Sequence, residues 1–381
     1  MASPQASPKL RVLIAGGGIA ALETALALHA LAPELTETTL LAPNTELVNR
    51  PMTVREPFAD PLAHRYPLAL IAAEADAQLV AGTLAWVDPA ARIVHTASEQ
   101  ELSYDALVLA LGGRISPRYK HAITIDDRNL EETMHGLIQD IEGGFVGSVA
   151  FVAPPRMGWQ LPIYELALMT AARAFDANVE LDVSIVTPED SPLAIFGQGA
   201  STGVGELLDR ARISAFTSAY AEIPEQGRIV ITPGGHQLEV DRIVALPELF
   251  GPEIRGIALS EHGFLGVDQH CRLLDHDDVW AAGDAIDFAV KHGGLGSQQA
   301  DVVAEAIAAR AGAEVTPAPF QPVIRGMLLT GGKPVYLTAR ITGGAGFSSE
   351  ISDEPSWWPA TKVASRYLSP CLDALEHART P

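Results

Sequence analysis

The amino-acid sequence predicts an α/β protein, and three observations lead to this prediction. An apolar strand, a turn of three glycines and a long helix follow one another between residues 11 and 32. A second strand–helix–strand unit lies between residues 148 and 187. Alternating units of this kind build parallel sheets covered by helices. After Pro317 and Pro319 the pattern changes to two strands and a short final helix. We therefore expect two Rossmann-like domains and a small C-terminal α+β domain.

The first strand runs directly into a glycine-rich turn. Gly16, Gly18 and Ala21 match the G-x-G-x-x-G/A pattern of dinucleotide-binding turns. Residues 19–31 are mostly strong helix formers, and Pro33 ends the run. Glycines let the backbone approach a pyrophosphate, whose charge is stabilised by the N–H groups and the positive dipole end of the helix. The segment predicts a dinucleotide-binding turn.

Composition and charge argue against several classes of protein. The chain of 381 residues has 26 basic and 47 acidic side chains and a net charge of −21, which argues against nucleic acid and anionic membranes as partners. Its two cysteines, Cys271 and Cys371, form no disulfide or zinc pattern, so we expect a cytoplasmic protein. The 11 histidines show no closed ligand spacing, and we expect no metal site. Residues 1–9 are rich in Pro, Ser and Ala, and we expect them to be disordered.

The end of the second predicted strand, at residues 38–41, lacks the usual acid for a ribose hydroxyl. Ala42 and Pro43 occupy its place, which leaves Asn44 or Glu46 as candidates. The basic residue and rigid turn at 50–51 indicate either a functional loop or an ordinary surface turn. A buried strand at 104–111 ends in two glycines, which suggests a close approach of the backbone to another group.

The second strand–helix–strand unit has an unusual loop. Its strands are predicted at 148–153 and 181–187, with a helix at 162–175, but the intervening loop reads PPRMGWQLP. Prolines have no N–H to offer a phosphate, and Trp159 adds bulk, so we expect an altered or degraded nucleotide site. Glu189 is either a ribose ligand or a solvated loop acid. A strand at 241–246 is expected to return to the first domain.

The late strand at 279–283 runs into Asp284. A helix is predicted from Ser297, as its N-cap, to Ala311, and Gly312 ends it.

With these elements in order, the chain resembles the two-dinucleotide-binding-domain flavoproteins of the pyridine nucleotide-disulfide oxidoreductase superfamily. Within that superfamily it is most similar to the branch of sulfide:quinone oxidoreductases and type II NADH dehydrogenases. The segments that carry the resemblance are GGGIAALETALAL, YDALVLALGG, VWAAGDAIDFAVKHGGLGSQQADVVAEAIAA and WWPATKVASRYLSP. It implies an FAD domain split between residues 10–116 and 245–316, a second, NAD(P)-type domain at 117–244 and a C-terminal interface domain at 317–381.

The resemblance also implies roles for single residues. The turn with Gly16, Gly18 and Ala21 would hold the FAD pyrophosphate. Lys291 would stand beside the pyrimidine edge of the flavin, where a cation and a helix N-terminus stabilise the negative charge of the reduced ring and raise its potential. The other residues assigned to the cofactor are Asn44, Arg50, Pro51, Ala110, Gly112, Gly283, Asp284, Gln298 and Gln299.

Two departures from the family bear on function. A cysteine used in sulfide oxidation is replaced by the segment at 157–159, and the glycine-rich second turn of the NADH dehydrogenases is absent. We expect an FAD-dependent oxidoreductase without redox-active cysteines, whose donor and acceptor are NAD(P)H, a quinone, a small organic molecule or a protein partner. The alternative is a flavin-binding partner or scaffold with little turnover. The terminal segment 365–381 suits a peripheral membrane contact or a homodimer interface.

Overall fold

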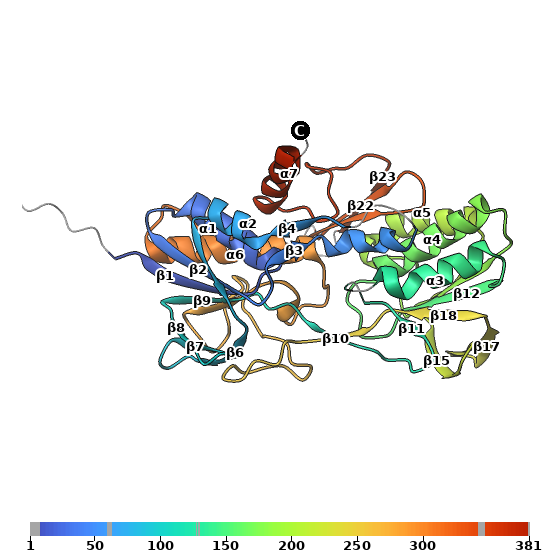
Figure 1. Cartoon of the computed structure of the whole chain (residues 1–381), viewed down its shortest axis with the longest axis horizontal. Helices are drawn as coiled ribbons and strands as arrows, with labels where there is room; N and C mark the ends of the chain where they lie inside the picture. Colours follow the sequence, from blue (N-terminus) through green and yellow to red (C-terminus); the bar gives the residue numbers. More distant parts are fainter. Residues whose placement is uncertain (1–7, 59–62, 127, 129, 342–346, 380–381) are drawn as a thin grey trace, which may run out of the picture.

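The computed structural model of the chain describes residues 8–58, 63–126, 128, 130–341 and 347–379. Most of the segment at 1–9, for which the sequence predicts disorder, lies outside these residues. The molecule is elongated, with one parallel sheet toward each end and the C-terminal elements above the region between them (Figure 1).

The first parallel sheet has the strand order β20-β9-β1-β2-β5. Helices α1 and α6 pack against each other on one face, and the small antiparallel sheet β6-β7-β8 covers the other. Because β20 comes from the far side of the second domain in sequence, the first domain is split, as predicted. Its strands are β1 (Leu10–Ala15), β2 (Thr36–Ala42), β5 (Ala77–Ala81), β6 (Leu84–Asp88), β7 (Ile93–Thr96), β8 (Glu101–Ser103), β9 (Ala106–Leu109) and β20 (Val279–Ala281), and its helices are α1 (Ile19–Leu31), α2 (Leu68–Glu74) and α6 (Gly293–Ala311).

The second parallel sheet has the order β11-β18-β12-β13-β14. It confirms the second Rossmann-like domain, with an antiparallel sheet, β15-β16-β17, beside it. The strands are β11 (Ile123–Thr124), β12 (Ser148–Val152), β13 (Asp182–Val186), β14 (Ile213–Phe216), β15 (Tyr220–Glu225), β16 (Arg228–Thr232), β17 (His236–Glu239) and β18 (Arg242–Ala245), and the helices are α3 (Leu130–Glu142), α4 (Leu161–Asp176) and α5 (Gly197–Arg210).

The prediction that the strand at 241–246 returns to the first domain was wrong. This strand, β18, pairs in parallel with β12 and β11 inside the second sheet. The Asp241 carboxylate fixes it there, because it accepts the backbone N–H groups of Gly147 and Ser148 at 2.8 and 3.0 Å. The crossing back to the first domain comes later, where β19 pairs with β10.

The remaining elements connect the two domains and form the C-terminal region. The C-terminal sheet is antiparallel, β21-β22-β23, and is followed by a helix that packs on α1. These elements are β3 (Glu46–Val48), η1 (Arg50–Phe58), β4 (Arg65–Pro67), β10 (Arg114–Ser116), η2 (Ala194–Phe196), β19 (Glu248–Phe250), η3 (Gly283–Ala285), β21 (Val323–Leu328), β22 (Val335–Ile341), β23 (Phe347–Ser352) and α7 (Leu368–Arg379).

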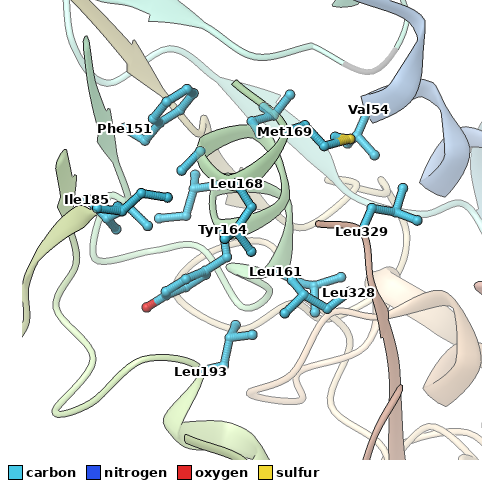
Figure 2. Packing of buried hydrophobic residues seen from close by; sticks show 14 of the residues in the cluster. Val54, Phe151, Leu161, Tyr164, Leu168, Met169, Ile185, Leu193, Leu328 and Leu329 are labelled. Carbon is cyan, nitrogen blue, oxygen red and sulfur yellow. The ribbon is translucent and has the colours of Figure 1, made fainter. Parts of the chain in front are cut away.

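One apolar cluster joins the three parts of the chain around α4. In Figure 2, Val54 of η1 and Leu329, just after β21, lie on one side of α4, while Leu168 on the other side faces Phe151 and Ile185 of the second sheet. Burial of such side chains is the main favourable term in folding. The cluster therefore fixes the second domain against η1 and the C-terminal sheet.

Helix α6 begins four residues earlier than the sequence predicted. Ser297 lies inside the helix instead of at its N-cap, and His292 precedes the first turn. Gly293 packs closely against α1, because a Cβ at this position would lie 2.9 Å from Ile19 Cδ1. The predicted C-terminal end is confirmed, with Gly312 in the left-handed conformation.

Candidate functional site

The carboxyl ends of β1 and β9 meet closely. Gly16 follows β1 with φ +137°, and a Cβ at this position would lie 2.1 Å from the carbonyl oxygen of Ala110. Ala110 in turn donates its N–H to the Ala15 carbonyl at 2.9 Å. Only glycine fits both the backbone angle and the space. The first glycine of the turn is thus fixed by the end of the neighbouring strand.

Gly18, by contrast, faces open space. A Cβ at Gly18 would have no atom within 4 Å. The first helical bond of α1 runs from the Leu22 N–H to the Gly18 carbonyl at 3.1 Å, so the N–H groups of residues 19–21 lie at the open end of the helix. Ala21 is fully buried on the packed side. An open turn before free N–H groups fits a bound pyrophosphate.

The η3 turn lies beside this cradle. Gly283 has φ +78°, and a Cβ there would approach the Ala20 Cβ at 3.2 Å. The Gly283 N–H donates to Gln299 Oε1 at 2.8 Å, which fastens the turn to α6. Asp284 follows directly in η3 and is half-buried. The sequence-predicted residues Gly16, Gly18, Ala21, Ala110, Gly283, Asp284 and Gln299 therefore gather around one edge of the first sheet.

The Lys291 ammonium group is bound to the backbone of the η3 segment. It donates to the Asp284 carbonyl at 3.2 Å and to the Ile286 carbonyl, and it lies 3.7 Å from the centroid of the Phe264 ring. Burial lowers the pKa of Lys291 to about 8, against the opposing charges of Asp284 and Asp287. The lysine thus orders the turn that carries Asp284, and its contact with the flavin stays a prediction.

Other predicted residues lie apart from this cluster or have other contacts. The Gln298 amide donates to the carbonyls of Gly294 and Val323 and accepts the Val323 N–H, each at 2.9 Å, so it ties β21 to α6. Arg50 and Pro51 open η1, which packs against α3 of the second domain. Asn44 is exposed in the bend after β2, and Gly112 has φ +70° with open space around it. Flavin contacts of these residues stay predictions.

A buried ion pair that the sequence did not reveal lies at the meeting point of α4, β21 and the C-terminal segment. Lys362 Nζ donates to Glu165 Oε2 at 2.5 Å, with the two side chains 4% and 0% exposed. Glu165 Oε1 accepts the Leu329 N–H at 3.0 Å. Burial lowers the pKa of Lys362 and raises that of Glu165. The only sequence signal is the charge of Glu165 inside the apolar run LPIYELALM.

His292 stands beside this pair, at the start of α6. Burial, with a smaller contribution from the charge of Lys362, lowers the pKa of His292 to about 3, so the imidazole is neutral. Its ring lies 4.2 Å from the Trp159 ring, centroid to centroid. Trp159 comes from the loop after β12, so the second domain contacts the start of α6 directly.

Both cysteines are free thiols, Cys271 buried and Cys371 half-buried. Burial raises the pKa of Cys271 to about 12 and also raises that of Cys371. A thiol held protonated in this way is a poor nucleophile. No group of three or more potential ligands that could hold a metal ion occurs among the described residues.

The chain is similar in fold to solved two-domain flavoproteins. Over 91% of this chain and 87% of the other, it matches the sulfide:quinone oxidoreductase of the hyperthermophilic bacterium Aquifex aeolicus, with a TM-score of 0.80 and 18% identity. The chain has the two-dinucleotide-binding-domain fold. A ferredoxin reductase from Rhodopseudomonas palustris matches with a TM-score of 0.68 and 19% identity over 90% of this chain and 88% of that one.

A third similar structure is the covalent complex of putidaredoxin reductase with putidaredoxin. The match has a TM-score of 0.64 and 16% identity, over 91% of this chain and 88% of that one. No protein-family model and no curated protein matches the sequence. Within the part of the chain that the structure describes, no helix has the length and apolar character needed to cross a membrane.

Proposed function

We propose that the protein is an FAD-dependent oxidoreductase that passes electrons through a bound flavin without redox-active cysteines. The observation that carries the proposal is the cradle at the edge of the first sheet. There, the open turn at Gly18 and the free end of α1 stand beside the η3 turn with Asp284. The resemblance to two-dinucleotide-binding-domain flavoproteins implies that such a glycine turn holds the FAD pyrophosphate and that the acid after the late strand binds the polar chain beside it.

The residues of the cradle have separable tasks. Gly16 lets the turn pack against the Ala110 carbonyl, Gly18 leaves room for the pyrophosphate, and the N–H groups at the start of α1 bind it. Gln299 and Lys291 hold the η3 backbone, which orients Asp284 toward the cofactor. The flavin, when bound, supplies the electron chemistry. The chain itself contributes binding, orientation and a positive charge.

Electron donor and acceptor remain to be assigned among NAD(P)H, a quinone, a small organic molecule and a protein partner. A protein partner is supported by the solved complex of putidaredoxin reductase with putidaredoxin, which shares the fold. We also propose a cytoplasmic location, from the cysteine usage, and α7 as a surface for a peripheral membrane contact or a homodimer.

The test begins with purified protein reconstituted with FAD and its visible spectrum. The bound flavin is then followed anaerobically during additions of NADH, NADPH and sulfide in turn. A yellow protein whose flavin is reduced by an added donor supports the proposal. Rapid reduction by sulfide that depends on Cys271 or Cys371 would show that a thiol route exists after all.

A second candidate function is a flavin-binding scaffold with little turnover. The loop at 154–160 favours it, because two prolines and Trp159 stand where a nucleotide turn would be. This candidate predicts a yellow protein that no donor or protein partner reduces. Photochemical reduction of the bound flavin then shows whether the ring is chemically competent.

A further inference from the structure

The loop at 154–160 connects β12 to α4, the position of the phosphate-binding turn in a Rossmann-like domain. Here it is tied to the first domain. The Gly158 carbonyl accepts the Lys291 N–H at 3.2 Å, and the Arg156 carbonyl accepts the Leu249 N–H at 3.0 Å. A Cβ at Gly158 would lie 2.7 Å from the Ala289 carbonyl oxygen. The loop is therefore packed against neighbouring backbone on the side facing the first domain.

Trp159 fills the space next to the loop with its ring. The ring centroid lies 4.2 Å from that of His292 and 5.6 Å from that of Phe196, which packs edge to face. The edge-to-face geometry with Phe196 is a favourable one for aromatic pairs. Trp159 thereby bridges the second domain and the start of α6, next to the Lys291 segment that is predicted to lie near the flavin.

Glu189, the acid after the second strand of this domain, is bound by its own chain. Tyr164 Oη donates to Glu189 Oε2 at 2.7 Å, and Thr187 Oγ1 donates to the same oxygen at 3.2 Å. With its amide nitrogen facing the carboxylate, Gln160 donates to both oxygens, at 2.9 and 3.1 Å. Burial raises the pKa of Glu189 to about 7. The sequence left open whether Glu189 is a ribose ligand or a solvated acid, and the structure shows a half-buried carboxylate that accepts hydrogen bonds on both oxygens.

A dinucleotide needs free N–H groups at the turn and an acid for a ribose hydroxyl. Pro154 and Pro155 offer no N–H, the Trp159 ring packs between the loop and the start of α6, and Glu189 already accepts hydrogen bonds from Gln160 and Tyr164. A ribose hydroxyl could reach the half-buried Glu189 only by displacing donors that already bind it, such as the Gln160 amide. A bound nucleotide would therefore lack N–H donors for its phosphates and a free acid for its ribose hydroxyl.

We infer that Trp159, Gln160 and Glu189 are specificity-determining residues that keep pyridine dinucleotides out of the second domain, so that the flavin takes electrons from a donor other than NADH or NADPH. The inference rests on the proposed function and narrows its donors to a quinol, a small organic molecule or a protein partner. The second domain then serves to cover the flavin edge, with its own side chains in the place of a nucleotide.

The experiment uses the FAD-loaded protein under anaerobic conditions. NADH and NADPH are titrated while flavin absorbance and binding by equilibrium dialysis are followed, and photochemical reduction shows that the flavin is competent. The expected result is neither reduction nor binding with a dissociation constant below about 1 mM, the level that corresponds to about −4 kcal/mol. Reduction or tighter binding by either nucleotide would overturn the inference. A colourless protein would instead overturn the proposed function.

A variant series tests the residues themselves. Trp159→Ala combined with Gln160→Ala opens the approach and releases Glu189, and we expect its affinity for NADH to exceed the wild-type limit at least tenfold. Trp357→Ala, which removes a ring packed on Tyr336 in the C-terminal domain, is the matched control and is expected to behave as wild type. Bound FAD and the melting curve verify folding. A folded double variant that refuses NADH as the wild type does would refute the role of Trp159 and Gln160.

Discussion

The buried pair of Glu165 and Lys362 provides the sharpest stability prediction. Lys362→Met removes the cation that pairs with a fully buried carboxylate, since the Glu165 side chain is 0% exposed. Breaking a buried pair by removing one partner costs about 3–5 kcal/mol, because the remaining charge lacks compensation. We expect a loss of this size in the free energy of unfolding at pH 7, measured by urea denaturation of the FAD-free protein.

Two features distinguish this mechanism from a simple loss of packing. In Lys362→Met the folded protein retains a raised pKa at Glu165, so the destabilisation grows as the pH rises above about 4.5, the ordinary value of a glutamate. The double variant with Glu165→Gln removes the lone charge and keeps an acceptor for the Leu329 N–H, so most of the stability returns. A Lys362→Met variant within about 0.5 kcal/mol of wild type at pH 7 would refute the reasoning.

Three further predictions concern the first domain and its contacts. Burial and the charge of Glu23 raise the pKa of Asp301 to about 8, against an ordinary value of 3.8. The folded state therefore binds this proton more tightly than the unfolded state, and stability falls as the pH rises between these two values. Asp301→Asn is expected to flatten this dependence of stability on pH in melting curves, and an unchanged dependence would count against the reasoning. Gly16→Ala places a Cβ 2.1 Å from the Ala110 carbonyl oxygen and is expected to cost at least about 1–3 kcal/mol in urea denaturation, whereas wild-type stability would contradict the close approach. Lys291→Met is expected to lower the midpoint potential of the flavin, measured by spectroelectrochemistry. The difference in potential between wild type and variant should shrink above pH 8, where the wild-type lysine loses its proton. Equal potentials at pH 6 would disprove the electrostatic role of Lys291.

Local patterns were sufficient to predict the first strands and helices of both Rossmann-like domains, whereas α2, α3 and α5 were not predicted. Apolar runs bounded by glycine and proline located β1, α1, β12 and α4 to within two residues. Each of these elements is buried and therefore consists mainly of consecutive apolar residues, which the sequence shows directly. Local patterns do not specify which sheet a strand joins. The strand at 241–246 was therefore assigned to the wrong domain, since its neighbour β12 lies far away in sequence.

The candidate site was predictable only where its chemistry is local. The turn at Gly16 and Gly18 is recognisable from the local G-x-G-x-x-G/A pattern. Glu165 and Lys362, by contrast, are 197 residues apart and pair only in the folded chain. Glu23 is similar: its carboxylate accepts the backbone N–H groups of residues 366–368, at the start of α7, at 2.6–2.9 Å, and the sequence does not show that these are its partners. A lone acid inside an apolar helix is the signal that would have indicated both.

The cradle at Gly18 allows the most direct test of the central claim, that the first domain binds FAD through its pyrophosphate. Gly18 is the N-cap of α1, has an extended backbone with φ −94°, and has space for a side chain. Gly18→Asp therefore preserves the fold, and can add up to about 1 kcal/mol of stability as an N-cap, while it sets a carboxylate against the pyrophosphate. The account predicts that FAD affinity, measured by calorimetry on the FAD-free protein, falls at least about 100-fold. A Gly18→Asp variant that binds FAD as tightly as wild type would contradict it.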